Sequence, residues 1–134
     1  MKNSQKVILV DAVHTLVIEN EGGFSIFNEM YALLETFPNR KIVLTGANDE
    51  QFKEFELEKV PYEIFTLKQN PKKTNPEYFR RLLQAFDLRP EQAVYFEHDD
   101  QAVKSAESVG IVSYFYNAEK RDLKSLAKFL EKNL

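Results

Sequence analysis

Five short runs of apolar residues alternate with stretches of helical periodicity, and this alternation constrains the fold more than any other feature. Each run is too short for a helix and is apolar at consecutive positions. Strands that are buried on both faces of a parallel sheet have this pattern. The runs cover residues 7–10, 42–44, 64–67, 93–96 and 111–115.

The segments between these runs carry apolar residues at spacings of three and four, which is typical of helices that bury one face. They cover residues 27–37, 76–87, 103–109 and 123–130, with a weaker pattern over 49–57. Pro76 suits the first turn of its helix, and Thr74 and Glu77 have the spacing of a capping box. Gly110 is expected to end the helix over 103–109.

The segment from Val17 to Gly23 does not fit the alternation. Its two glycines follow a β-branched pair, which predicts a turn or a short hairpin beyond the first strand. The rest of the chain predicts an α/β fold, a three-layer sandwich with a mainly parallel five-stranded sheet and helices on both faces. No linker or internal repeat is visible, so we expect a single domain over residues 1–134.

The composition excludes several classes of function. Lys and Arg number 18 and Asp and Glu 21, so the formal net charge is −3 and offers no net positive field for nucleic acid. The chain has no cysteine, which excludes disulfides, thiolate zinc sites and cysteine nucleophiles. No apolar run approaches the ~20 residues that span a bilayer. Residues 1–6 lead directly into the first run, and we expect a cytoplasmic protein that binds neither nucleic acid nor a membrane.

Polar residues follow the apolar runs, at positions where parallel sheets bind their ligands, outside the carboxyl ends of the strands. A carboxylate can attack phosphorus, a hydroxyl and an ammonium group can hold phosphate oxygens, and acids can bind a hard divalent cation. This set of groups predicts phosphoryl chemistry. The candidate site residues are Asp11, Thr45, Gly46, Lys73, Glu97 and His98.

The order and spacing of these residues resemble the four motifs of the haloacid dehalogenase (HAD) superfamily, over nearly the whole chain. The first motif, a strand followed by Asp-x-Asp-x-Thr, resembles residues 7–16. The second, a strand ending in Ser or Thr, resembles residues 42–46. The third, a Lys before a helix that opens with Pro-Glu, resembles residues 73–79. The fourth, acids at a strand end before a helix that ends in Gly, resembles residues 94–110.

This resemblance implies a role for each residue. Asp11 is the implied nucleophile, which forms a covalent phospho-aspartyl intermediate. Thr45, Gly46 and Lys73 are implied to hold the phosphoryl group, so that Asp11, Thr45 and Lys73 are the candidate catalytic residues. The implied cofactor is Mg²⁺, or another divalent metal because of His98. The residues implied for metal binding are Asp11, the backbone carbonyl of Val13, Glu97 and His98.

Three positions depart from the HAD pattern. Val13 replaces the second acid of the first motif, which protonates the leaving group and activates water in HAD phosphatases; losing such acid–base help typically costs ~10²–10⁴ in rate. His98 replaces the second acid of the fourth motif, although imidazole suits zinc, iron or nickel better than magnesium. Asp99 and Asp100 are candidate substitutes for that acid. His14 either restores an acid–base group near neutral pH or fills space above the site.

HAD branches that lack the second acid of the first motif rely on an Arg or Lys from a cap domain. Here residues 12–40 and 46–72 are occupied by the expected hairpin, helices and strand, which leaves no room for a cap. An open cleft of this kind implies a large phosphorylated substrate, or closure by another subunit.

The sequence supports two hypotheses of function. The first is a slow or unusual metal-dependent phosphohydrolase that uses Asp11 as its nucleophile. The second is a catalytically inactive HAD-fold protein with a binding or regulatory role, because acids are missing at both Val13 and His98. A phosphoacceptor of the response-regulator type fits less well, since residues 7–10 are wholly apolar where further acids are expected. The sequence predicts neither the identity of the substrate nor the oligomeric state.

Overall fold

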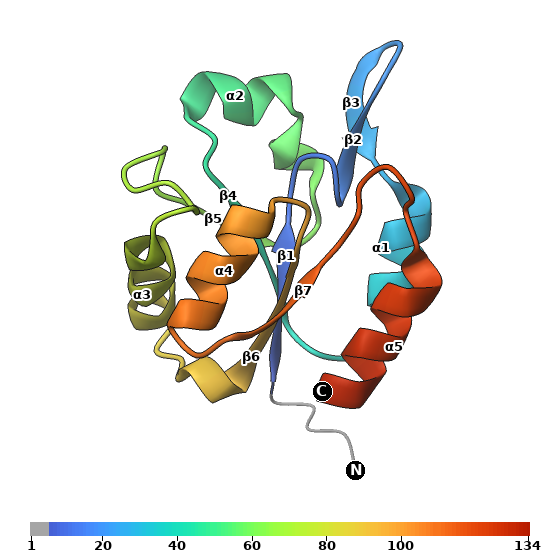
Figure 1. Cartoon of the computed structure of the whole chain (residues 1–134). Coiled ribbons are helices and arrows are strands. Elements are labelled where there is room, and N and C mark those ends of the chain that lie inside the picture. The colour runs from blue at the N-terminus through green and yellow to red at the C-terminus, as the bar shows by residue number, and fades with distance from the viewer. Residues whose placement is uncertain (1–5) are drawn as a thin grey trace.

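A computed structural model of the chain describes residues 6–134, so residues 1–5, which were expected to lead into the first strand, lie outside the described residues. Five strands form one sheet in the order β5-β4-β1-β6-β7, and every pairing is parallel (Figure 1). They coincide with the five predicted runs to within one residue at each end, which confirms the predicted α/β sheet. The strands are β1 (Val7–Asp11), β4 (Lys41–Thr45), β5 (Glu63–Thr66), β6 (Ala93–Glu97) and β7 (Val112–Phe115).

Helices cover both faces of this sheet, as predicted. One face is covered by α1 (Asn28–Glu35) and α5 (Leu123–Asn133), and the other by α3 (Pro76–Ala85) and α4 (Asp100–Ser108) (Figure 1). Three short helical segments complete the described chain: α2 (Asp49–Glu54) with the 3₁₀ turn η1 (Leu57–Lys59), and the 3₁₀ turn η2 (Pro90–Gln92).

Strand β1 is buried at every position because both of its faces are covered. Ile8 and Val10 pack in the core beneath α1 and α5, whereas Val7 and Leu9 pack in the core beneath α3 and α4. Burying an aliphatic side chain of this size contributes about 1.5–3 kcal/mol. The strand that ends in Asp11 is therefore firmly anchored from both sides.

The hairpin predicted from Val17 to Gly23 is present. Strand β2 (Val17–Asn20) pairs antiparallel with β3 (Gly23–Ile26) and projects beyond the carboxyl end of β1 (Figure 1). Gly23 adopts a φ of +119°, a conformation that side chains disfavour, which explains a glycine at this turn.

The residue that caps α3 differs from the prediction. The capping box of Thr74 and Glu77 is wrong, because Asn75 caps α3 and its Oδ1 accepts a hydrogen bond from the Glu77 backbone N–H at 3.0 Å. Pro76 disfavours a helical conformation in the residue before it, so Asn75 takes the extended backbone that an N-cap needs. Gly110 follows the end of α4 with a φ of +93°, which confirms the predicted stop.

The described residues contain no separate cap domain, since the hairpin, α1, α2 and η1 account for the segments that precede β4 and β5. None of the helices over residues 6–134 combines the length and the apolar character that crossing a membrane requires. The cytoplasmic location stays a prediction.

Candidate active site

The two main carboxylates of the site end neighbouring strands. From β1 the chain moves to β4 and β5 on one side of the sheet and then to β6 and β7 on the other, so the strand order reverses at β1 and β6. Ligands of open parallel sheets bind at this switch point. Asp11 is the last residue of β1 and Glu97 the last of β6, with Val10 paired to Phe96 in the register between them.

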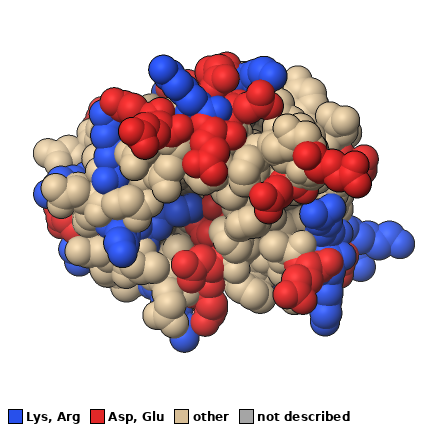
Figure 2. Space-filling model, turned by 90° about the horizontal axis from the view of Figure 1, so that it is seen from above, with Lys and Arg blue, Asp and Glu red and all other residues tan. Residues whose placement is uncertain are grey.

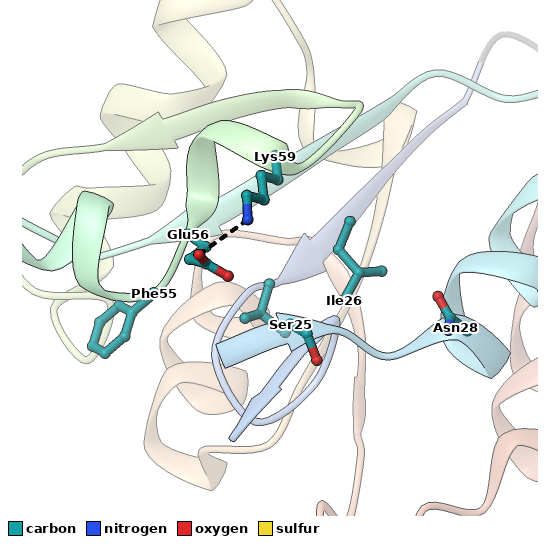
Figure 3. Close-up of a pocket in the computed structure, with 7 residues that line it drawn as sticks. Ser25, Ile26, Asn28, Phe55, Glu56 and Lys59 are labelled. Atoms are coloured by element: carbon teal, nitrogen blue, oxygen red, sulfur yellow. Dashed lines mark hydrogen bonds and ion pairs between the residues drawn. The ribbon is translucent and has the colours of Figure 1, made fainter. Parts of the chain in front are cut away.

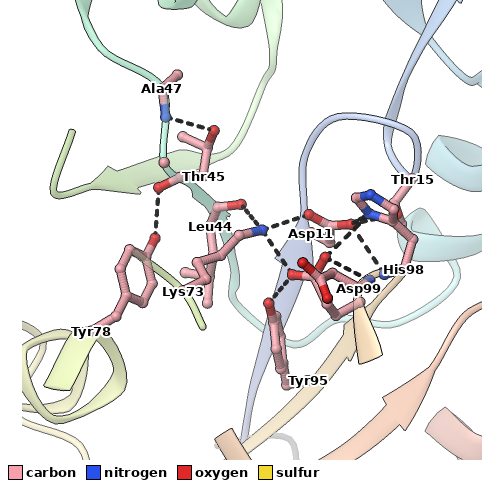
Figure 4. Close-up of polar contacts among 12 residues, drawn as sticks. Asp11, Thr15, Leu44, Thr45, Ala47, Lys73, Tyr78, Tyr95, His98 and Asp99 are labelled. Atoms are coloured by element: carbon pink, nitrogen blue, oxygen red, sulfur yellow. Dashed lines mark hydrogen bonds and ion pairs between the residues drawn. The ribbon is translucent and has the colours of Figure 1, made fainter. Parts of the chain in front are cut away.

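Lys73 joins these two carboxylates from the loop that precedes α3. Its Nζ donates to Asp11 Oδ1 and to Glu97 Oε1, each at 2.7 Å, and lies 3.4 Å from the Leu44 carbonyl oxygen (Figure 4). The Lys73 side chain is 16% exposed, and the carboxylates are 1% and 0% exposed. The ion pairs are therefore shielded from water, where electrostatic interactions are strong.

His98 joins the same carboxylates through their other oxygens. Its Nδ1 contacts Asp11 Oδ2 and lies 3.1 Å from Glu97 Oε2, and its backbone N–H donates to Asp11 Oδ2 at 3.3 Å (Figure 4). Two carboxylates and two basic groups thus form a closed network, which we call the charged network (Asp11, Lys73, Glu97 and His98).

Three further groups hold the carboxylates in place. The Thr15 hydroxyl donates to Asp11 Oδ2 at 2.7 Å, the Tyr95 hydroxyl donates to Glu97 Oε1, and the Asp99 backbone N–H donates to Glu97 Oε2 at 3.1 Å. No role was predicted for Thr15 or Tyr95 from the sequence. The signal for Tyr95 was its position two residues before Glu97, since alternate residues of a strand lie on one face.

The environment shifts the pKa values of the two carboxyl groups in opposite directions. Burial alone would raise the pKa of Asp11, but the Lys73 ammonium and the His98 ring outweigh it and hold that pKa well below its usual range. Burial raises the pKa of Glu97, the charge of Asp11 raises it further, and Lys73 offsets only part of this. Asp11 is therefore ionised at neutral pH, and Glu97 is the first of the two to take up a proton.

The pKa values of both basic groups are raised. Burial would lower the pKa of Lys73, but the charges of Asp11 and Glu97 outweigh it and raise that pKa above its usual range. Hydrogen bonds to Asp11 and then Glu97 raise the pKa of His98 to about 10, against the effect of its partial burial. Both groups carry a positive charge at neutral pH.

A cavity of about 170 Å³ opens over the charged network at the carboxyl edge of the sheet. Six of the seven predicted site residues line it, and Glu97 lies beneath it, fully buried. Seen from above, acidic and basic side chains are interspersed around this edge (Figure 2). The predicted residues that line the cavity are Asp11, Val13, Thr45, Gly46, Lys73 and His98.

Thr45 and Gly46 form the wall of this cavity opposite His98, but their polar groups engage local partners. The Thr45 hydroxyl accepts a hydrogen bond from the Ala47 backbone N–H at 3.1 Å (Figure 4). The Gly46 carbonyl accepts one from Gln69 Nε2 at 2.7 Å. A Cβ on residue 46 would lie 2.1 Å from that nitrogen, so glycine lets Gln69 approach the cavity.

The remaining polar residues near the site contact His98 or residues of α4. The exposed His14 ring meets the His98 ring edge to face, with centroids 5.2 Å apart. Asp99 caps α4 by accepting from the Gln101 N–H at 2.9 Å, and Asp100 pairs with Lys104 at 3.2 Å. Neither acid takes the place that His98 occupies against Asp11.

The chemistry of the donors favours particular metals. One ligand atom each from Asp11, Glu97 and His98 lies within 4.8 Å of the others, close enough to hold one ion. The set comprises two buried carboxylates and one imidazole. Magnesium prefers oxygen ligands, whereas imidazole suits zinc, iron or nickel. These residues therefore fit a divalent metal that accepts nitrogen better than they fit magnesium.

Comparison with known proteins supports the fold. No protein-family model matches the sequence, and no curated protein matches it. The structure resembles a magnesium complex of a HAD family enzyme from Bacteroides thetaiotaomicron, with a TM-score of 0.65 and 13% identity over 84% of this chain and 93% of that chain. An aspartate-to-alanine mutant of that enzyme, bound to magnesium and inorganic phosphate, gives a TM-score of 0.64 and 12% identity over 84% and 94% of the two chains.

A third similar structure is the core domain of a Streptococcus pneumoniae protein described as a phosphoglycolate phosphatase. Its TM-score is 0.63 and its identity 18%, over 95% of this chain and 96% of that chain. The likeness extends over most of both chains in each of these structures. The chain thus shares the fold of these proteins, as its resemblance to the HAD motifs predicts.

Proposed function

We propose that this chain is a HAD-type hydrolase that removes the phosphoryl group from a phosphorylated substrate, with Asp11 as the nucleophile. The observation that carries the proposal is an ionised, buried carboxylate at the floor of a cavity, 2.7 Å from a Lys ammonium group. The similar B. thetaiotaomicron enzyme, crystallised with magnesium and phosphate, supports the same chemistry.

The hydrogen bonds of Asp11 favour one of its oxygens as the attacking atom. Oδ2 accepts from the Thr15 hydroxyl and contacts both the backbone N–H and the ring of His98. Oδ1 accepts from Lys73 Nζ, its one hydrogen-bond donor within the described part of the chain. We therefore assign the attack to Oδ1, with Oδ2 held in place.

The reaction proceeds in two displacements. Asp11 Oδ1 forms a bond to phosphorus while the bond from phosphorus to the leaving-group oxygen breaks. Water then attacks phosphorus, the bond to Oδ1 breaks, and inorganic phosphate leaves with Asp11 restored. The Lys73 ammonium group, beside Oδ1, stabilises the negative charge of the phosphoryl oxygens. Thr45 and Gly46 form the wall of the cavity that contacts the phosphoryl group from the other side.

The missing acid at Val13 affects the first displacement. A valine side chain cannot protonate the departing oxygen, so leaving groups that are stable as anions should react fastest. We expect aryl and acyl phosphates to be hydrolysed faster than alkyl phosphates.

A divalent metal would be held by Asp11, Glu97 and His98, together with the backbone carbonyl of Val13, and its binding would displace the proton that His98 otherwise carries. When bound, it would supply positive charge against the phosphoryl oxygens. The imidazole of His98 favours a metal other than magnesium for this position.

The test is hydrolysis of a panel of phosphate esters with magnesium, manganese, cobalt or zinc. Asp11→Asn should reduce the rate to background, whereas Asp49→Asn, an exposed acid on α2, should leave it unchanged. Equal rates for the wild type and Asp11→Asn would refute the proposal. Phosphate binding without any turnover would instead indicate a binding or regulatory protein.

A further inference from the structure

A second cavity, of about 250 Å³, lies between the β2–β3 hairpin and the segment that joins α2 to η1 (Figure 3). The hairpin side and the start of α1 contribute Val17, Ser25, Ile26 and Asn28. The opposite side contributes Phe55, Glu56 and Lys59. Glu56 adopts a φ of +54°, a left-handed conformation that is uncommon outside glycine and that clusters at functional sites.

Phe55 is shared by this cavity and the cavity of the candidate active site. Its side chain lines both cavities, and its ring packs edge to face against Phe24 of the hairpin, with centroids 4.8 Å apart. The two cavities therefore adjoin at Phe55.

The lining indicates the chemistry of an occupant. Val17, Ile26 and Phe55 provide apolar surface. Ser25 Oγ accepts a hydrogen bond from Asn20 Nδ2 at 2.6 Å, which leaves its own hydroxyl hydrogen to be donated. Lys59 Nζ lies 3.0 Å from Glu56 Oε1, so the two charges at the rim compensate each other. Such a lining suits an uncharged group with apolar faces and a hydrogen-bond acceptor.

The size of the cavity sets the scale of that group. A cavity of ~150 Å³ lined by apolar side chains holds benzene. We propose that this second cavity binds the part of the phosphorylated substrate next to the phosphoryl group, and that this part is an uncharged ring bearing a hydroxyl or carbonyl oxygen. This inference rests on the proposed function, because the phosphoryl group is what aligns the ring with the cavity.

The experiment compares two ligands that cannot be hydrolysed. Methylphosphonate probes the phosphoryl site alone, and benzylphosphonate adds a ring. Calorimetric titration of the wild type should give a Kd for benzylphosphonate that is lower by ~10-fold or more, as burial of a ring predicts. Ser25→Trp fills the cavity and should abolish this difference while the Kd of methylphosphonate stays unchanged. Ser25→Ala leaves the cavity open and should retain most of the difference.

The outcomes separate this inference from the proposed function. Equal affinities in the wild type, or a ring preference that survives in Ser25→Trp, would overturn the inference while the phosphoryl site stands. If neither phosphonate binds, the proposed function fails and the inference fails with it. Asn28→Trp, which fills the cavity from the exposed first turn of α1, replaces Ser25→Trp if that variant melts below the wild type.

Discussion

Replacing Lys73 by methionine should destabilise the protein strongly. Its Nζ lies 2.7 Å from both Asp11 and Glu97, whose side chains are 1% and 0% exposed. Methionine keeps the length of the side chain but leaves two buried carboxylates without their shared ammonium group. Removing one partner of a buried ion pair costs about 3–5 kcal/mol. For a chain of this length that corresponds to a fall in Tm of ~10–18 °C.

The pH dependence of this loss has a definite sign. Burial and the charge of Asp11 raise the pKa of Glu97 above 4.5 already in the wild type, where Lys73 offsets part of the rise. Without Lys73 this pKa rises further, so the folded Lys73→Met variant retains a proton, which the unfolded chain releases, up to a higher pH than the wild type does. Its stability therefore falls as the pH rises from 4.5 through that raised pKa, and the loss relative to the wild type grows.

Urea denaturation across this pH range, with thermal melts beside it, measures the effect. The neighbouring Lys72→Met is the matched control, because Lys72 is exposed and its replacement should change the free energy of unfolding by less than about 0.5 kcal/mol. A Lys73→Met variant as stable as Lys72→Met, or a loss that does not vary with pH, would refute the picture of a shared buried cation.

Two further predictions concern the other partners of the carboxylates. The pKa of His98 is raised from 6.5 to about 10, so the stability that its charge contributes is fully present below pH 6.5 and is lost as the pH rises through about 10. The difference in unfolding free energy between the wild type and His98→Asn should therefore shrink over that range. A difference that stays constant would contradict this prediction. Tyr95→Phe removes a donor to Glu97 and should cost about 1–3 kcal/mol by urea denaturation. Tyr116→Phe should cost nothing, because the buried Tyr116 hydroxyl has no hydrogen-bond partner among residues 6–134, and an equal loss in both variants would argue against the role of Tyr95.

The strands could be predicted because helices cover both faces of a parallel sheet and bury its strands completely. With helices on both faces, Val7 to Val10 are all buried, and the strand shows in the sequence as an unbroken apolar run. The start of α3 was less predictable, because Thr74 and Asn75 are both good N-cap residues. The constraint that Pro76 puts on its neighbour decided between them.

The sequence predicted which residues form the candidate site better than it predicted the contacts between them. The resemblance to HAD motifs placed Lys73 and Asp11 in one predicted site, and the two side chains lie in hydrogen-bond contact although they are far apart along the chain. The hydrogen bond from the Ala47 backbone N–H to the Thr45 hydroxyl could not be predicted from the sequence. Tyr95 was predicted only as part of the buried run over residues 93–96, although its hydroxyl donates to Glu97.

What the sequence determined by itself is which polar residues stand at the ends of buried strands, because hydrophobic periodicity depends only on local order along the chain. Only the tertiary structure decided which of their atoms meet. The strand order sets Asp11 beside Glu97, and the conformation of the loops brings Lys73 and His98 to opposite sides of that pair. Those contacts depend on distances through space between residues far apart in the chain, which no pattern along the sequence encodes.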